Sequence, residues 1–327
     1  MKTDTVGHFR YSYGPVPSRR LGKSLGINNV PAKMCTYSCV YCQVGRTTGM
    51  KFDRRCFYKP EDIFRDAQSR LIQAKEKSER VDYLAFVPDG EPTLDVNLGQ
   101  EITLLKSLKV PIGVITNSSL LWREDVREEL GEADWVSVKI DTVQETIWRQ
   151  INCPHPLLVL SAILEGIKKF SKTFSGRMVT ETMLVRGVND TNDHIQEVAD
   201  FLETVQPQAA YLSIPTRPPA EKWVQGPDEA VLNRAYHILA GKVERVEYLT
   251  GYEGNAFVQT GDIEQDILNI AAVHPMRKEA VEMLLGRAGS SWDVIVRLLA
   301  HGDLVEIPYG GNLFYLRRFA KDRKGSP

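Results

Sequence analysis

The chain has 327 residues, of which 43% are hydrophobic and 25% are charged. This balance is that of a soluble globular protein and excludes a collagen-like, coiled-coil or disordered chain. The 41 basic residues nearly cancel the 42 acidic ones, so no overall field draws the chain to nucleic acid or to a membrane surface. No apolar run approaches the roughly 18 residues that span a bilayer, and residues 1–10 lack the apolar core of a secretory signal. We therefore expect a cytoplasmic protein with one large domain and one small domain.

The first unusual segment, residues 13–22, is a proline-rich loop that carries the adjacent arginines Arg19 and Arg20. It precedes a predicted strand near Leu25. A guanidinium group can hold a carboxylate or a phosphate through two hydrogen bonds. We therefore predict that Arg19 and Arg20 contact such a group on a substrate. The alternative is that they form ion pairs at the rim of the fold.

Three of the five cysteines follow within eight residues, as Cys35, Cys39 and Cys42, while Cys56 and Cys153 are isolated. An odd number of cysteines in a large chain argues against a disulfide framework. The array could be three unrelated thiols, a zinc site or part of an iron–sulfur cluster. Zinc takes four ligands, often from two C-x2-C pairs, whereas three thiolates can hold a four-iron cluster and leave one iron open. The clustering and the lack of a second pair favour the iron–sulfur cluster.

Together with Tyr41, which precedes the third cysteine, this array resembles the signature of the radical S-adenosylmethionine (SAM) superfamily. The resemblance implies that Cys35, Cys39 and Cys42 ligate three irons of a [4Fe-4S] cluster and that SAM binds the fourth. It also implies reductive cleavage of SAM, usually to methionine and a 5′-deoxyadenosyl radical. A low-potential electron donor such as flavodoxin or ferredoxin is then required. The two other cysteines are too few for an auxiliary cluster, so we expect a single cluster.

After the cysteine loop, strand-like and helix-like segments alternate. Continuous apolar runs predict buried parallel strands at residues 83–87, 112–115, 135–138, 178–185 and 209–214. Helical patterns separate them at residues 61–77, 98–108, 123–130, 157–170 and 194–205. Counted from the strand near Leu25, about six β-α units predict an α/β protein with a parallel sheet. A partial (β/α)6 barrel is the fold that we expect, and the resemblance implies the same one.

Ligands of parallel α/β sheets gather at the carboxyl ends of the strands, so polar residues that follow a strand are candidate SAM contacts. Asp89, Gly90 and Glu91 follow the first apolar run after the cysteine loop. They resemble the superfamily segment that holds the amino group of SAM, and a carboxylate suits an ammonium partner. The alternative is an ordinary turn, because Asp-Gly and Glu-Pro are common in turns.

The next two predicted strands are followed by Asn117 and by Lys139 with Asp141. By resemblance, these strand ends face the ribose and the carboxylate of SAM. Asn117 and Asp141 would then contact ribose hydroxyls, and Lys139 the carboxylate. The alternative is that Asn117 and Asp141 cap the helices that follow them.

Residues 151–155 match a stretch that relatives usually show as Asn-Arg-Pro-His, with Cys153 in the place of the arginine. We predict that His155 contacts substrate or handles a proton; the alternative is a structural histidine.

Residues 13–22 and 251–257 resemble a little-characterised radical SAM subfamily. Its relatives are the enzymes that form the tricyclic wyosine base of tRNA. This resemblance covers nearly the whole chain.

The sequence pattern changes at residues 264–268, and we take this change as the start of a second domain. Two short amphipathic helices and a glycine-turned hairpin suggest a winged helix, with the elements at residues 275–285, 291–300, 304–307 and 313–316. We expect the barrel, the winged-helix-like domain and a disordered tail at residues 1–260, 261–319 and 320–327. From residue 271 onward, nine basic residues face six acidic ones. This net charge of +3 is sparse for a nucleic-acid-binding face, so peptide docking and RNA docking both stay open.

The sequence therefore predicts a radical SAM enzyme of oxidoreductase or transferase type that acts on an unidentified substrate. The candidates are a tRNA base, a peptide or protein, and a small molecule, the last including aminocarboxypropyl transfer. The non-enzymatic alternative is an iron–sulfur redox sensor with a nucleic-acid-binding winged helix. No catalytic residue beyond the cofactor ligands is predicted.

Overall fold

The computed structural model describes residues 11–250, 257 and 262–318. Eight of the described strands form one sheet: β1 (Ser12–Ser18), β2 (Gly22–Ile27), β5 (Tyr83–Phe86), β6 (Ile112–Thr116), β7 (Trp135–Lys139), β8 (Arg177–Met183), β9 (Ala209–Ser213) and β10 (Val246–Leu249). They lie in the order β1-β2-β5-β6-β7-β8-β9-β10. Neighbours from β2 onward are parallel, and β1 is antiparallel to β2. Because β1 and β10 are its two edges, the sheet is open, as a partial barrel requires.

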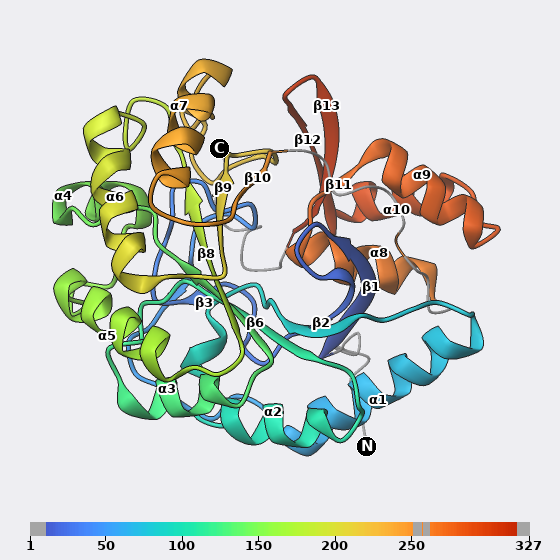
Figure 1. The fold of residues 1–327 in the computed structure, drawn as a ribbon. Coiled ribbons are helices and arrows are strands. Elements are labelled where there is room, and N and C mark those ends of the chain that lie inside the picture. The colour runs from blue at the N-terminus through green and yellow to red at the C-terminus, as the bar shows by residue number, and fades with distance from the viewer. Residues whose placement is uncertain (1–10, 251–256, 258–261, 319–327) are drawn as a thin grey trace.

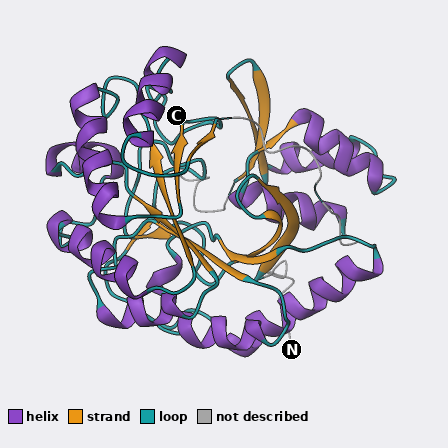
Figure 2. Cartoon of the chain, viewed as in Figure 1, coloured by secondary structure: helices purple, strands orange, loops and turns teal. Residues whose placement is uncertain are grey.

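Helices cover the outer face of the curved sheet (Figures 1 and 2): α1 (Pro60–Glu76), α2 (Leu98–Lys106), α3 (Glu124–Gly131), α4 (Glu145–Asn152), α5 (Leu160–Thr173), α6 (Asn192–Val205) and α7 (Glu229–Ala240). Within the large sheet, each of β2, β5, β6, β7, β8 and β9 is followed by at least one of these helices before the next strand of that sheet, which confirms the predicted six β-α units. The short elements β3 (Met34–Cys35), β4 (Gly49–Met50) and η1 (Pro92–Leu94) lie in the loops. None of the described helices is long and apolar enough to cross a membrane.

The predicted strands and helices between residues 61 and 214 are all present, with bounds that differ by at most three residues. The sequence patterns missed α4, α7 and β10, and most of the predicted proline-rich loop forms the strand β1 instead. The helix α7 buries only Ala235 and Leu239, so its apolar stripe is too thin to recognise. The strand β10 has four residues and lies at an edge of the sheet, where one-sided burial leaves no continuous apolar run.

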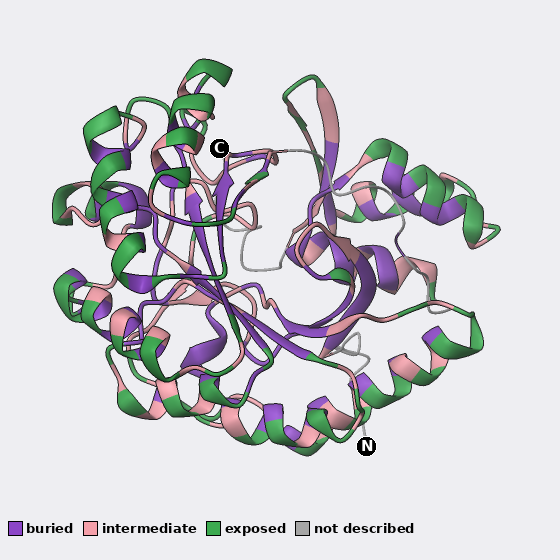
Figure 3. Ribbon diagram, in the orientation of Figure 1, coloured by how far each residue is buried: buried purple, intermediate pink, exposed green. Residues whose placement is uncertain are grey.

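Alternate residues of the strands point to opposite faces of the sheet, and both faces are buried (Figure 3). Leu84 and Phe86 belong to the core beneath the helices, whereas Ala85 and Trp135 belong to a smaller cluster inside the barrel. Burial on both sides is the physical reason why the strands read as unbroken apolar runs. It also leaves the loops after the strands as the place for polar chemistry.

The C-terminal unit, residues 263–317, consists of α8 (Ile263–Val273), β11 (Met276–Arg277), α9 (Lys278–Arg287), α10 (Asp293–His301), β12 (Leu304–Tyr309) and β13 (Asn312–Arg317). Its strands form an antiparallel sheet in the order β11-β13-β12. The unit lies beside β1 (Figure 1), and Tyr13 and Val16 of that strand belong to its apolar core. The sequence patterns missed α8 and β11. The helix predicted at residues 275–285 corresponds to α9, which begins three residues later, at Lys278. The two residues before Lys278 form β11 and pair with β13.

The predictions for residues 251–256 and for the tail at residues 320–327 lie outside the described residues.

Candidate functional site

Of the three clustered cysteines, Cys35 is the last residue of β3, and Cys39 and Cys42 lie on the loop between β3 and β4. Cys35, Cys39 and Cys42 are partly buried, unpaired thiols, and all three line one cavity of about 160 Å³. Among the described residues, no three His, Cys, Asp or Glu side chains converge tightly enough to hold a single metal ion. A four-iron cluster has a different requirement, since each cysteine binds a different iron. Three thiols on the walls of one cavity fit that requirement.

The surroundings of the thiols also fit a cluster. Burial raises the pKa of Cys39 to about 12 and that of Cys42 to about 11, so the metal-free thiols are protonated at neutral pH. Bound iron would favour the thiolates instead. The Nδ2 atom of Asn117 lies 3.4 Å from Cys35 Sγ, and Nδ2 of Asn152 lies 3.5 Å from Cys39 Sγ. Such N–H groups stabilise thiolates and tune the potential of a cluster.

The segment after β5 forms the opposite wall of this cavity, which Asp89 and Gly90 both line. Its backbone pairs with the cysteine loop: the N–H of Glu91 donates to Met34 O at 3.0 Å, and the N–H of Lys33 to Asp89 O at 2.6 Å. A Cβ atom on Gly90 would lie 2.1 Å from Met34 O. Glycine is therefore needed here because two backbones approach closely.

Glu91 is fully buried and connects the ends of two strands. One carboxylate oxygen accepts hydrogen bonds from Thr93 and from the hydroxyl of Thr116, and the other accepts from the backbone N–H of Asn117 at 2.7 Å. Burial raises the pKa of Glu91 above its ordinary value, although these hydrogen bonds act in the opposite direction. Glu91 does not line the cysteine cavity.

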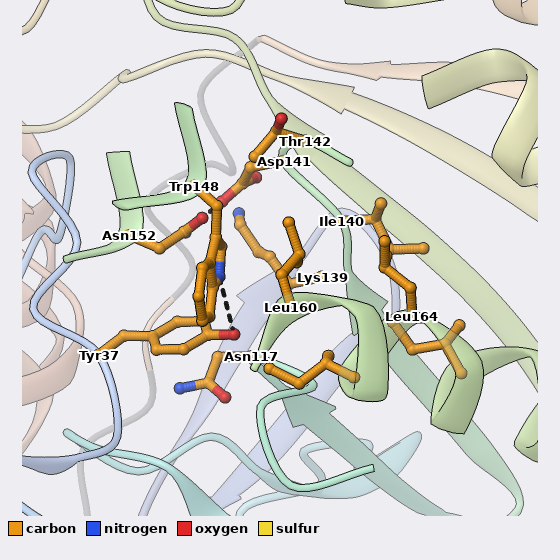
Figure 4. Close-up of a pocket in the computed structure, with 12 residues that line it drawn as sticks. Tyr37, Asn117, Lys139, Ile140, Asp141, Thr142, Trp148, Asn152, Leu160 and Leu164 are labelled. Carbon is orange, nitrogen blue, oxygen red and sulfur yellow. Dashed lines mark hydrogen bonds between the residues drawn. The ribbon is translucent and has the colours of Figure 1, made fainter. Parts of the chain in front are cut away.

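A second network joins the cysteine loop to the end of β7. Asp141 Oδ2 accepts hydrogen bonds from the hydroxyl of Tyr41 and from Nδ2 of Asn152, the latter at 2.7 Å. Its Oδ1 accepts from the backbone N–H of Met183 at 2.9 Å. Asp141, Asn152, Lys139 and Asn117 are among the residues that line a pocket of about 20 Å³ (Figure 4). That volume has room for about one water molecule.

Helix capping is not what Asn117 and Asp141 do. The helices that follow them begin after Arg123 and Gln144. The side chain of Asn117 instead accepts from the N–H of Ser119 at 3.0 Å, so this alternative is wrong for both residues.

The interior of the barrel holds a second cavity, of about 240 Å³. Four cationic side chains line it together with one carboxylate: Arg19, Arg20, Lys139, Arg217 and Glu181. The residues Cys42, Gln43 and Val87 line this cavity and the cysteine cavity alike. The two cavities therefore share a wall, and the cysteine loop faces both.

The carboxylate of Glu181 holds two of these cations. Lys139 Nζ lies 2.9 Å from Glu181 Oε1, and Arg20 Nη1 pairs with the other oxygen. Burial alone would raise the pKa of Glu181, but Lys139 and Arg20 lower it to about 2. Arg20 therefore forms an ion pair with Glu181, as the alternative interpretation of the paired arginines predicted. Lys139 has Glu181 as its carboxylate partner within the protein.

His155 lines neither of these two cavities. Its backbone N–H donates to Thr36 O at 2.9 Å, and its ring stacks on Phe52 with the ring centres 5.6 Å apart. The sequence patterns missed Asn152, Glu181 and the polar groups near them. Asn152 had one signal, its place in the stretch of residues 151–155. Glu181 is a charged residue within the polar part of β8, and no neighbour along the sequence indicates its cationic partners.

Comparisons with known proteins agree with this geometry. The model of the radical SAM superfamily matches residues 29–202, just over half of the chain. The UPF0026 protein MJ1312 of Methanocaldococcus jannaschii is 46% identical over 309 residues, which cover 94% of this chain and 95% of that protein.

Among solved structures, a radical SAM methyltransferase from Sphaerobacter thermophilus has a TM-score of 0.53 at 15% identity, over 69% of this chain and 66% of that chain. SuiB of Streptococcus suis, solved with its precursor peptide SuiA, has a TM-score of 0.51 at 15% identity, over 68% and 48%. These two likenesses concern the fold.

Proposed function

The chain belongs to the radical SAM superfamily, and from this premise we propose that it is a single-cluster enzyme whose substrate carries an anionic group and binds inside the barrel. The observation that carries the proposal is the wall shared by the two cavities. Three cysteines line one cavity, cationic side chains line the other, and Cys42 borders both.

In this proposal Cys35, Cys39 and Cys42 hold a [4Fe-4S] cluster. When bound, the cluster and SAM supply the electron transfer that cleaves SAM and yields a carbon radical. The chain contributes the surroundings: Asn117 and Asn152 donate toward the ligand sulfurs. The curved sheet and its covering helices keep water away from the reacting centre.

The SAM contacts that the sequence suggests stay predictions, and the structure supports some more than others. Asp89 and Gly90 line the cysteine cavity, where they can meet the amino group of SAM. Asn117 and Lys139 lie at the ends of the neighbouring strands β6 and β7, and Tyr41 lies on the cysteine loop. Tyr41 and Lys139 line the barrel cavity. Both carboxylate oxygens of Asp141 and of Glu91 already accept hydrogen bonds from the protein. We propose that they order the strand ends on which the other contacts lie.

The charge of the barrel cavity supports an anionic substrate. Four cationic groups line the cavity, and the Glu181 carboxylate compensates one of these charges. A carboxylate or a phosphate of the substrate would compensate more of this charge inside a region of low dielectric constant.

We further propose that residues 261–319 form a winged-helix-like domain that presents a macromolecular substrate, while residues 1–260 form the barrel. The order of the described elements, helix, strand, two helices and a hairpin whose second strand pairs with β11, supports this. A peptide and a tRNA base are the two macromolecular candidates. SuiB, which shares the fold, was solved with a peptide.

The test is anaerobic reconstitution with iron and sulfide, followed by dithionite and SAM, with the products identified by mass spectrometry. We expect 5′-deoxyadenosine, and we expect its yield to rise with the correct member of a panel of bulk tRNA, peptides and small anionic compounds. Methylthioadenosine above the non-enzymatic background would indicate aminocarboxypropyl chemistry instead. No cleavage with an assembled cluster and the whole panel would favour the sensor alternative.

The matched variants are Cys39→Ala, in the motif, and Cys56→Ala, which changes an exposed cysteine outside it. We expect Cys39→Ala to lose cluster assembly and SAM cleavage entirely while the barrel stays folded. Cys56→Ala should behave as the wild type. Normal SAM cleavage by Cys39→Ala would overturn the assignment of the cluster.

A further inference from the structure

The residue that follows the third cysteine connects the cysteine loop to the C-terminal unit. Gln43 Nε2 donates to the backbone oxygen of Val273, the last residue of α8, at 2.9 Å. Gln43 Oε1 accepts from Arg217 Nη1 at 2.7 Å. Both ends of one amide side chain are therefore used, one toward the C-terminal unit and one toward the loop after β9.

The end of α8 needs such a partner. The last four carbonyl groups of a helix have no N–H donor within the helix. Gln43 donates a hydrogen bond to one of them, the carbonyl oxygen of Val273. Arg217 Nη2 lies 2.9 Å from His274 Nε2, the residue after the helix. A guanidinium at this position also suits the partial negative charge at a helix C-terminus. Gln43 and Arg217 together hold the end of α8 over the barrel.

This end of the helix is part of the cofactor cavity. Val273 lines the cysteine cavity together with Gln43 and the three cysteines. A second contact supports the same arrangement, since Tyr309 of β12 donates from its hydroxyl to Pro215 O at 3.1 Å. The loops that follow β3 and β9 lie at the mouth of the barrel, where the barrel cavity also lies. The C-terminal unit therefore contacts this mouth at two places, through α8 and through the hairpin of β12 and β13.

We propose that Gln43 is a positioning residue that couples the C-terminal unit to the cluster-binding loop and keeps Val273 in place as a wall of the cofactor cavity. The inference rests on the proposed function only in the identity of the cofactor. Coupling between two sites is reciprocal. Cluster assembly should therefore order the end of α8, and movement of α8 on binding a substrate should reach the loop that carries Cys42.

The first test is hydrogen–deuterium exchange of the metal-free protein, compared between the wild type and Gln43→Leu. Loss of both hydrogen bonds should speed exchange about tenfold in residues 268–276 and also in residues 38–48. The matched control is Arg46→Ala on the same loop. The Arg46 side chain is largely exposed and pairs with Glu221, so its removal should change exchange less than about twofold.

Gln43→Glu separates the two bonds and serves if Gln43→Leu does not fold. Its carboxylate still accepts from Arg217 but cannot donate to Val273 O, so we expect faster exchange at residues 268–276 with a smaller change at residues 38–48. Faster exchange confined to the end of α8 in Gln43→Leu would show a local helix cap and overturn the coupling. Unchanged exchange in both segments would overturn it as well.

The second test follows the cluster rather than activity. Reconstitution with iron and sulfide should slow exchange at residues 268–276 in the wild type and leave it unchanged in Gln43→Leu. Equal slowing in both proteins would contradict the role of Gln43. If no cluster forms in the wild type, the proposed function fails, while the comparison of the metal-free proteins still decides whether Gln43 couples the two parts.

Discussion

Two buried carboxylates, one at the mouth of the barrel and one in the helix layer behind the sheet, lie in opposite electrostatic surroundings. Glu181 is beside Lys139 and Arg20, which outweigh the effect of burial and lower its pKa to about 2. Glu101 of α2 accepts a hydrogen bond from Asn29 at 3.1 Å. Burial raises the pKa of Glu101 to about 9, and the neighbouring carboxylate of Asp95 adds to the rise.

The comparison shows that burial alone does not decide whether a carboxyl group is ionised. A cation within hydrogen-bond distance keeps the group charged, whereas a neutral amide leaves it protonated. The mouth of the barrel therefore holds fixed, buried charges that a ligand can meet. The helix layer holds a neutral polar contact in a core. This difference agrees with the proposal that an anionic group binds at the mouth.

The largest expected effect comes from removing the charge at the mouth. Glu181→Gln leaves Lys139 and Arg20 buried without their carboxylate, which should lower the free energy of unfolding by about 3–5 kcal/mol. Denaturant unfolding of the metal-free protein measures this. The control is Glu203→Gln, which removes the exposed pair with Lys242 and should cost less than about 1 kcal/mol. Equal costs for the two variants would show that the Glu181 network does not stabilise the barrel.

The contribution of Glu181 to the free energy of unfolding can also be removed by lowering the pH, without a mutation. The pKa of Glu181 is lower in the folded protein than its ordinary value of 4.5. Its contribution is therefore present above about pH 4.5 and is lost as the pH falls toward about 2. Glu181→Gln should lack this component of the acid transition.

The next effect concerns the C-terminal unit, whose core is apolar. Leu284 of α9 is fully buried in that core, so Leu284→Ala should lower the free energy of unfolding by about 2–5 kcal/mol. Because no charge is involved, the cost should be equal at pH 5 and pH 8. The control is Val296→Ala on the exposed side of α10, which should change stability by at most about 0.5 kcal/mol. A cost for Leu284→Ala that depends on pH would contradict this explanation.

A further effect, spread over several pH units, concerns Glu101. The folded protein keeps a proton on Glu101 that the unfolded chain has released above about pH 4.5, so stability should fall as the pH rises from there toward about 9. One such group contributes a slope of at most about 1.4 kcal/mol per pH unit. Glu101→Gln keeps an acceptor for Asn29 and should flatten this slope. An unchanged slope would mean that Glu101 is ionised in the folded protein.

The sequence by itself determined the parts of this protein that depend on neighbours along the chain. Cys35, Cys39 and Cys42 are close because eight residues hold them, and that spacing indicated the superfamily. Most strands of the barrel were recognisable because burial on both faces makes most of their residues apolar. The segment after β5 was recognisable because it follows such a run directly.

Only the tertiary structure decided which polar groups meet at the mouth. Tyr41 and Asp141 are 100 residues apart in the sequence, and Gln43 and Val273 are 230 apart. Tyr41 belongs to the cysteine motif, but neither that motif nor any other pattern along the chain indicates which residue each of these side chains meets. The pairs form because the loop between β3 and β4 lies against the end of β7 and against the end of α8. The partner of each side chain is therefore a property of the packed barrel and of the unit that α8 attaches to it.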